Sequence, residues 1–163
     1  MLGVSVMAIN VPKEYEVPLY LFHQGKNAEA YKLFGSHFAE KDGVSGVVFR
    51  VWAPKAADVS VVGDFNHWNR EESYMKKISD GGIWELFIPG LKKFDNYKYS
   101  IKTERGQIKL KADPYGYHME TRPNTASKVY DISGYNWKDS KWMDEKKTKD
   151  VYRSPMNIYE VHL

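Results

Sequence analysis

The sequence predicts an all-β fold, an immunoglobulin-like antiparallel β-sandwich. Apolar and polar residues alternate in several short runs spread over about 90 residues, which is the pattern of strands with one buried face. Turn-forming Gly, Pro and Asp residues separate these runs. A chain of 163 residues with 42% hydrophobic residues is also large enough to enclose one core. Together these observations favour a single sandwich with extensions at both ends.

Residues 1–40 are expected to form a leader that contains a short helix. The apolar stretch at residues 15–22 is interrupted by Pro18, which favours an extended segment over a helix. The helix is expected after Asn27, a suitable N-terminal cap, and Gly35 stands where a left-handed C-terminal cap is needed. Residues 36–46 then form a polar approach to the sandwich.

The sandwich is expected over residues 41–132. Its first strand ends at Pro54 and has one face formed by Val47, Phe49, Val51 and Ala53. Residues 83–88 form a further strand between two turns, and residues 97–102 and 108–112 form a hairpin. A last strand is expected over residues 127–132.

The central strand leads into a turn, Gly63-Asp64-Phe65-Asn66-His67-Trp68, that carries a large ring. Val59 and Val61 should face the core, the opposite face should be mostly polar, and Phe65 should anchor the turn. Turn-forming amides such as Asn66 leave Trp68 near the surface. An exposed indole can stack on the apolar face of a pyranose while neighbouring amides bind its hydroxyls. A Trp68 that merely closes the end of the sandwich is the alternative.

Residues 133–155 are densely charged and are expected to be a linker, held down by Trp137 and Trp142. Residues 156–163 have the pattern of an apolar strand that reaches the end of the sequence without a turn or a polar tail. The unpaired backbone groups of such a strand invite association, so pairing between two copies of the chain is one expected outcome.

Several functional classes are not expected. The sequence has no Gly-rich phosphate loop, no Gly-x-Ser-x-Gly motif and no pair of His residues at a metal-binding spacing, so it offers no catalytic residue, metal site or cofactor site. Its charges of both signs are interleaved, which does not favour nucleic acid. The absence of Cys favours a reducing compartment, and the first ten residues lack the basic region of a signal peptide. We therefore expect a cytoplasmic protein without a membrane span.

Four runs, in the order Val48–Pro54, Gly63–Trp68, Tyr97–Tyr99 and Lys111–Tyr115, closely resemble the family 48 carbohydrate-binding module. That module is an immunoglobulin-like sandwich, found ahead of the catalytic barrel in the α-amylase superfamily (glycoside hydrolase family 13) and in glycogen-sensing kinase subunits. Three further runs look like those of 1,4-α-glucan (glycogen) branching enzymes: Glu120–Pro123, Ala126–Asp131 and Ile158–Leu163.

The branching-enzyme resemblance implies that the catalytic carboxylates lie on strands of a (β/α)₈ barrel outside these residues. The chain is then a non-catalytic N-terminal fragment, and residues 156–163 are the truncated first strand of that barrel. A free-standing glycogen-sensing adaptor and the N-terminal module of a debranching or trehalose-releasing enzyme are the alternatives.

For the sugar site, the resemblance implies stacking on Trp68 and hydrogen bonding by Lys98, and Asn66 is a further candidate in the same turn. Ile108 stands where the glycogen-sensing relatives have a second Trp, and Asn124 lies a few residues before the expected position of their Asn pair. We therefore expect only weak binding of α-glucan, such as glycogen, starch or a maltooligosaccharide. The main partner would be the catalytic barrel, which the module would brace.

Overall fold

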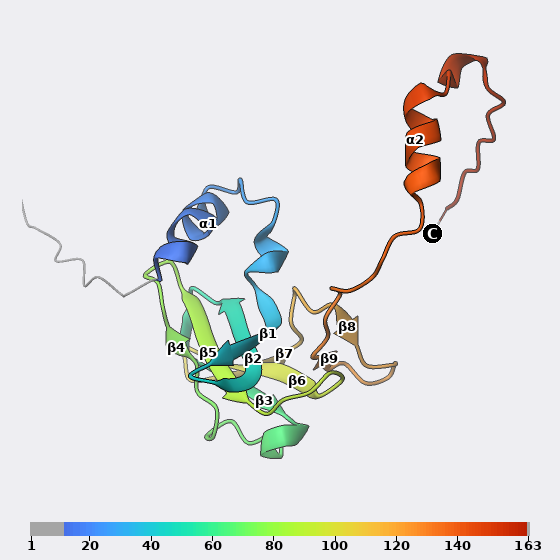
Figure 1. Cartoon of the computed structure of the whole chain (residues 1–163). Coiled ribbons are helices and arrows are strands. Elements are labelled where there is room, and N and C mark those ends of the chain that lie inside the picture. Colours follow the sequence, from blue (N-terminus) through green and yellow to red (C-terminus); the bar gives the residue numbers. More distant parts are fainter. Residues whose placement is uncertain (1–11, 163) are drawn as a thin grey trace, which may run out of the picture. The chain divides into compact units, whose positions relative to one another are not determined.

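The computed structural model describes residues 12–162 and divides the chain into two units, Met1–Asp131 and Ile132–Leu163. The first unit is a sandwich of two antiparallel sheets, as the sequence predicts (Figure 1). One sheet has the order β1 (Gly35–Lys41), β2 (Val44–Trp52), β5 (Ile83–Pro89), β4 (Lys76–Lys77). The other has the order β3 (Ala56–Gly63), β6 (Asn96–Thr103), β9 (Ser127–Lys128), β8 (His118–Met119), with β7 (Ile108–Lys111) paired to β6.

The core lies between the two sheets, where the predicted faces of the strands meet. Val47 and Phe49 of β2 are fully buried, as are Val59 and Val61 of β3. Tyr97 and Tyr99 of β6 complete this layer from the second sheet. The predicted alternation of apolar and polar residues is therefore confirmed for the main strands. Apolar side chains on one face of each strand are removed from water only between the two sheets.

The prediction of an extended segment at residues 15–22 is wrong, because α1 (Lys13–His23) is an α-helix that includes Pro18. Pro18 lacks only the N–H that would bond the Glu14 carbonyl, and the Pro18 carbonyl itself accepts a hydrogen bond from Asn27 Nδ2 at 3.0 Å. Leu19 is buried in a second apolar cluster formed with Leu33, Phe34, Ile78 and Ile83. Tertiary burial thus outweighs the local preference of proline.

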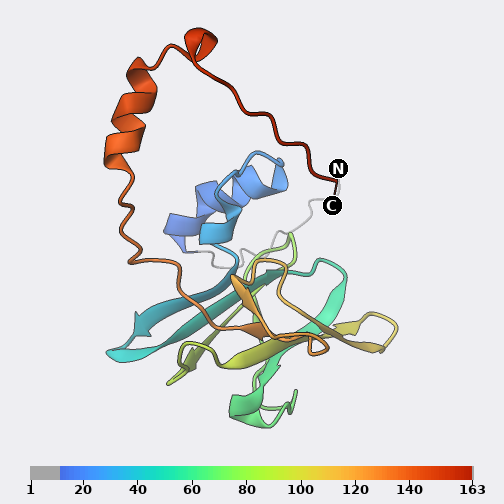
Figure 2. The ribbon, with the colours of Figure 1, turned by 90° about the vertical axis from the view of Figure 1, so that its right-hand side faces the viewer.

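The predicted helix after Asn27 is only a 3₁₀ turn, η1 (Ala30–Lys32), which lies beside α1 (Figure 2). Gly35 does have a positive φ, +100°, but it begins β1 instead of capping a helix. Residues 36–46, predicted as a polar approach to the sandwich, contain most of β1 and the turn into β2. The polar composition of β1 is that of an edge strand, which charged residues protect from further pairing.

The outer face of β3, predicted to be mostly polar, is fully buried at its centre. Ser60 and Val62 are shielded from solvent because the segment between β3 and β4, which includes η2 (Asp64–Asn66), folds back over this strand. Ser60 Oγ donates to the Arg70 carbonyl at 2.6 Å. The predicted last strand is shorter than expected, since β9 contains only Ser127 and Lys128.

The second unit contains a helix that the sequence did not predict, α2 (Ser140–Thr148), followed by the 3₁₀ turn η3 (Val151–Arg153). The ring contact of Trp137 is with Tyr135, and Lys146 lies over the Trp142 ring, so these contacts stay within the predicted linker. Residues 155–162 form no strand, and Leu163 lies outside the described residues.

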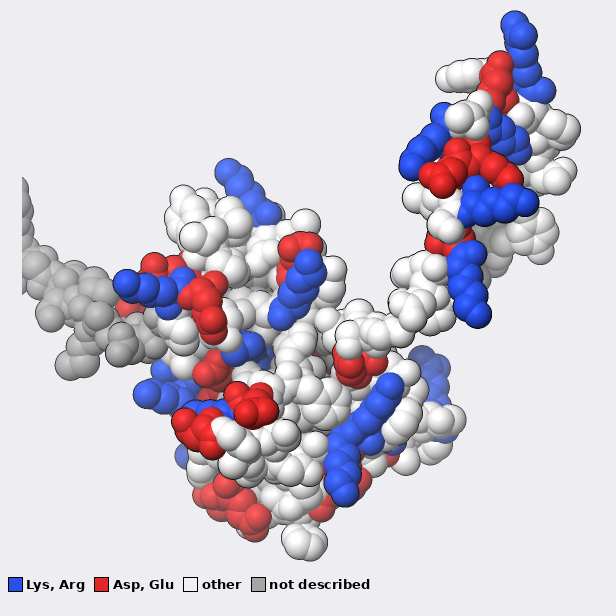
Figure 3. All heavy atoms as spheres, in the orientation of Figure 1, with Lys and Arg blue, Asp and Glu red and all other residues white. Residues whose placement is uncertain are grey.

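Charged groups of both signs are intermingled on the face drawn in Figure 3, in agreement with the interleaved pattern of the sequence. Within residues 12–162, no helix is both long enough and apolar enough to cross a membrane. The same residues contain no cluster of three or more side chains suited to bind a metal ion.

Candidate functional site

The turn after β3 has a backbone that few sequences can adopt. His67 and Trp68 both lie in the left-handed region, with φ of 52° and 60°. The Trp68 N–H donates to the Gly63 carbonyl at 2.9 Å, which closes the turn. Gly63 is required for another reason, since a Cβ at this position would overlap the Asn96 carbonyl oxygen and the Phe65 ring.

Asn66 supports this turn from beneath. Its side chain is only 4% exposed. Its Oδ1 accepts from the Gly63 N–H at 2.9 Å, and its Nδ2 donates to the Val61 carbonyl at 3.0 Å and to Ser73 Oγ at 3.1 Å. These hydrogen bonds use the amide group within the protein, so Asn66 holds the turn that carries Trp68 instead of facing solvent.

Trp68 lies at the surface with its indole fixed at one edge. The residue is 39% exposed. Its Nε1 donates to Asp64 Oδ1 at 2.9 Å, and the other oxygen of Asp64 accepts from Asn96 Nδ2 at 2.8 Å. Phe65, the predicted anchor, packs against the main core as a partly buried ring. The geometry therefore presents an indole whose orientation is set before any ligand arrives.

Lys98 of β6 lies beside the same surface. Its Nζ donates to Thr125 Oγ1 at 2.7 Å. Together with Trp68 it lines an open, shallow hollow of about 500 Å³. The other residues of this hollow are Asp64, Asn96, Leu110, Glu120, Pro123, Asn124 and Thr125. The structure therefore brings two of the three predicted site residues, Trp68 and Lys98, to one surface.

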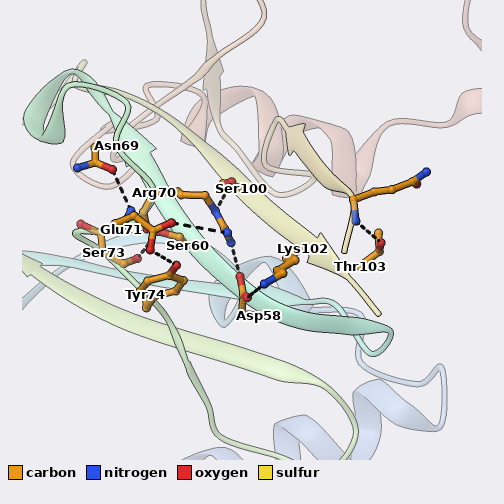
Figure 4. Close-up of polar contacts among 11 residues, drawn as sticks. Asp58, Ser60, Asn69, Arg70, Glu71, Ser73, Tyr74, Ser100, Lys102 and Thr103 are labelled. Atoms are coloured by element: carbon orange, nitrogen blue, oxygen red, sulfur yellow. Dashed lines mark hydrogen bonds and ion pairs between the residues drawn. The ribbon is translucent and has the colours of Figure 1, made fainter. Parts of the chain in front are cut away.

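An ionic network fastens the returning segment to the outside of the second sheet (Figure 4). The Arg70 guanidinium bonds Asp58 of β3 and lies 3.3 Å from Ser100 Oγ of β6. Lys102 Nζ approaches the second Asp58 oxygen at 3.9 Å. Because Arg70 follows Trp68 by two residues, this network restrains the far end of the turn just as Asn66 restrains its base.

Most residues of the hollow were not identified as site residues from the sequence, and Leu110 and Thr125 are two examples. Leu110 pairs with Ser100 and is exposed beside the hollow, whereas Ile108, which stands in place of a second ring, does not line it. Thr125 was missed because nothing in its local sequence marks it. Asn124, which the sequence placed too early, does reach the hollow, and its Nδ2 lies 3.5 Å from Glu120 Oε1.

Asp113 is the buried carboxyl group among the described residues, and it is not at the hollow. It accepts hydrogen bonds from Tyr97 Oη at 2.7 Å and from Tyr99 Oη at 3.0 Å. Burial raises the pKa of Asp113, and the donated hydrogen bonds oppose that rise. Because Asp113 is nearly fully buried and its oxygens accept hydrogen bonds from core tyrosines, we assign this group a structural role in the core.

Comparison with known proteins identifies relatives of this chain. The profile of carbohydrate-binding module 48 (isoamylase N-terminal domain) matches residues 33–116. The 1,4-alpha-glucan branching enzyme GlgB of Bacillus subtilis is 52% identical over 157 residues, which cover 96% of this chain and 25% of the relative. The GlgB of Thermosynechococcus vestitus is 46% identical over 156 residues, 96% of this chain and 20% of the relative.

Among solved structures, a Klebsiella pneumoniae pullulanase complexed with maltotriose is similar to this chain. It has a TM-score of 0.51 and 26% identity, over 66% of this chain and 10% of the pullulanase chain. The chain thus spans about a quarter or less of the length of the branching enzymes that it matches.

Proposed function

The chain belongs to the carbohydrate-binding module 48 family, and from this premise we propose that it binds α-glucan weakly at the hollow beside Trp68. The observation that carries the proposal is the fixed, partly exposed indole of Trp68 next to the Lys98 ammonium. A pyranose ring can stack on the indole while its hydroxyls bind Lys98, Asn124 and Thr125. Asn66 contributes by supporting the turn. Only one ring lines the hollow, which supports weak binding.

Replacing Trp68 by Ala should lower retention on an amylose or glycogen gel by about tenfold, because the stacking surface is lost. Lys98→Ala should weaken retention less, since Lys98 supplies hydrogen bonds only. Both changes should alter the free energy of unfolding by less than about 1 kcal/mol, because neither side chain is buried in the core.

Trp52→Ala is the matched control, because Trp52 is also about half exposed but belongs to the other sheet. Retention of this variant should equal that of the unsubstituted chain. The proposal would be contradicted if the Trp68 variant kept its retention and lost about 3–5 kcal/mol of unfolding free energy, as expected for a core Trp. Trp68 would then have a purely structural role.

We further propose that the chain is the N-terminal portion of a 1,4-α-glucan branching enzyme, and that its module braces the catalytic barrel. Identities of 46–52% with branching enzymes, against 26% with the pullulanase, support this parent over a debranching enzyme. The exposed side chains of Ile158 and Tyr159 support an apolar partner for residues 156–162, either the barrel or a second copy of this chain. The cytoplasmic location predicted from the sequence is part of the same proposal.

The isolated chain should show no branching activity. The nucleophile and the acid/base carboxylate that this chemistry needs are expected on barrel strands outside these residues, and Asp113 is sealed in the core. Incubation with amylose, followed by iodine staining and measurement of new α-1,6 linkages, tests this expectation. Linkages formed above a buffer control would contradict it.

A further inference from the structure

A second group of aromatic side chains lies on the surface near the start of β6. The ring centroids of Phe94 and Tyr130 are 5.5 Å apart, those of Phe94 and His118 are 5.6 Å apart, and those of His118 and Tyr130 are 5.1 Å apart. Lys93 Nζ lies 3.9 Å from the Tyr130 ring centroid and therefore covers that ring. Phe94 is 52% exposed and His118 is also exposed, so a ligand can reach both of these rings. We call these three rings the Phe94 cluster.

The Phe94 cluster and the Trp68 hollow lie on the same face of the second sheet. Asn96 pairs with Lys128, and Lys128 pairs with His118, so these three side chains share one face. Asn96 lines the Trp68 hollow. Phe94 and Tyr130 lie just beyond the ends of β6 and β9, and their rings contact the His118 ring, which places the Phe94 cluster beside these three side chains.

Polar groups connect the two aromatic positions. Trp68 Nε1 and Asn96 Nδ2 donate to the two oxygens of Asp64, and Lys128 Nζ donates to Asn96 Oδ1 at 2.7 Å. A row of hydrogen-bonding groups thus runs between an indole at one end and the Phe94 cluster at the other. Rings that stack on sugar faces, separated by groups that bind hydroxyls, are the arrangement that a chain of linked sugars requires.

The backbone of Phe94 is unusual for an exposed apolar residue. Its φ is 78°, in the left-handed region where Gly or Asn is normally found. The Phe94 N–H donates to the Val129 carbonyl at 2.7 Å, and the Lys92 N–H donates to Asp95 Oδ2 at 2.7 Å, so the turn is held firmly. Because half of the residue is exposed, burial alone does not account for a Phe at this left-handed position.

We propose that the Phe94 cluster is a second stacking position for the α-glucan that binds at Trp68. The inference rests on the proposed function and extends it to chain length. Asn96 lies on β6 and His118 lies on β8, two strands away and therefore about 10 Å apart at about 4.8 Å per strand, so a single sugar ring cannot span from the Trp68 hollow across the Phe94 cluster. Only a maltooligosaccharide of several units reaches from Trp68 to Phe94. This second position takes the place of the ring that is absent at Ile108.

The test is Phe94→Asn, because Asn accepts the left-handed backbone while removing the ring. Binding of maltotriose and of maltoheptaose by the full chain is measured by isothermal titration calorimetry. The unsubstituted chain should bind the longer sugar more tightly. The variant should lose about three- to tenfold in affinity for maltoheptaose and should keep its affinity for maltotriose. Phe38→Thr, which removes an exposed ring from β1 in the other sheet, is the matched control and should change neither affinity.

The two proposals fail in different ways. If the unsubstituted chain binds neither sugar, the proposed function and this inference are both overturned. If Trp68→Ala abolishes binding while Phe94→Asn leaves maltoheptaose affinity unchanged, only the second stacking position is wrong, and the Phe94 cluster then faces another partner. Equal losses for both sugars in the Phe94 variant would also overturn it, because a second position must discriminate by length.

Discussion

Replacing Asp113 by Ala should destabilise the chain by about 3–5 kcal/mol, measured by urea unfolding at neutral pH. The carboxyl group accepts from the hydroxyls of Tyr97 and Tyr99, and its Oδ1 accepts from the Tyr115 N–H at 2.8 Å. Alanine would leave these buried donors without their acceptor and would open a small void between the sheets. Because both tyrosines come from β6, the damage should spread through the second sheet and reduce the yield of folded chain.

Asp113→Asn is the matched variant, since it keeps the volume and one carbonyl acceptor while removing the charge. Burial raises the pKa of Asp113 above its value in the unfolded chain, so the native state binds the proton more readily. The contribution of Asp113 to stability is then greatest below the unfolded pKa, near 3.9, and is lost as the pH rises through the higher native pKa.

The cost of Asp113→Asn relative to the unsubstituted chain should therefore be greatest at low pH and should decrease as the pH rises through this window. The other carboxylates contribute equally to the pH dependence of both proteins, so their contributions cancel in the difference between the two unfolding free energies. A difference in unfolding free energy that is independent of pH, or that grows with pH, would contradict the raised pKa.

Replacing Asn66 by Ala should cost about 2–4 kcal/mol and should also lower retention on a glucan gel, by no more than the loss expected for Trp68→Ala. The Gly63 N–H would lose its acceptor, and the Val61 carbonyl would lose the donor that Asn66 Nδ2 supplies. The left-handed conformation of His67 and Trp68 depends on this support. The indole should therefore lose its fixed orientation. Fluorescence quenching can detect this loss in a background in which the exposed Trp52, Trp137 and Trp142 are replaced by Phe, since the remaining Trp84 is buried.

Asn69→Ala controls for the loss of an amide in the same turn. Asn69 is exposed, and its Nδ2 donates to Glu72 Oε1 at 2.8 Å at the surface. This change should cost less than about 1 kcal/mol and should leave glucan retention intact. Equal effects of the two substitutions would show that the turn does not depend on the buried amide.

The order and alternation of the apolar residues determined most of the sandwich. Val47 and Phe49 in one strand, and Tyr97 and Tyr99 in another, point to a core because a strand sends alternate side chains to opposite faces. Asp-Gly and Pro-Gly turns separated the strands correctly. The sequence also placed Trp68 at the surface, since amides and a histidine surround it in a turn.

Only the tertiary structure decided the features that depend on distant partners. Pro18 lies inside a helix because Leu19 is buried against residues far along the chain, an effect that no local rule contains. Asn66 is buried because Val61 and Ser73 supply partners on two sides of its amide. The Phe94 cluster unites residues 94, 118 and 130, whose side chains meet only through the pairing of β6, β9 and β8. Local alternation fixes which face a side chain occupies, but strand pairing alone fixes its neighbours on that face.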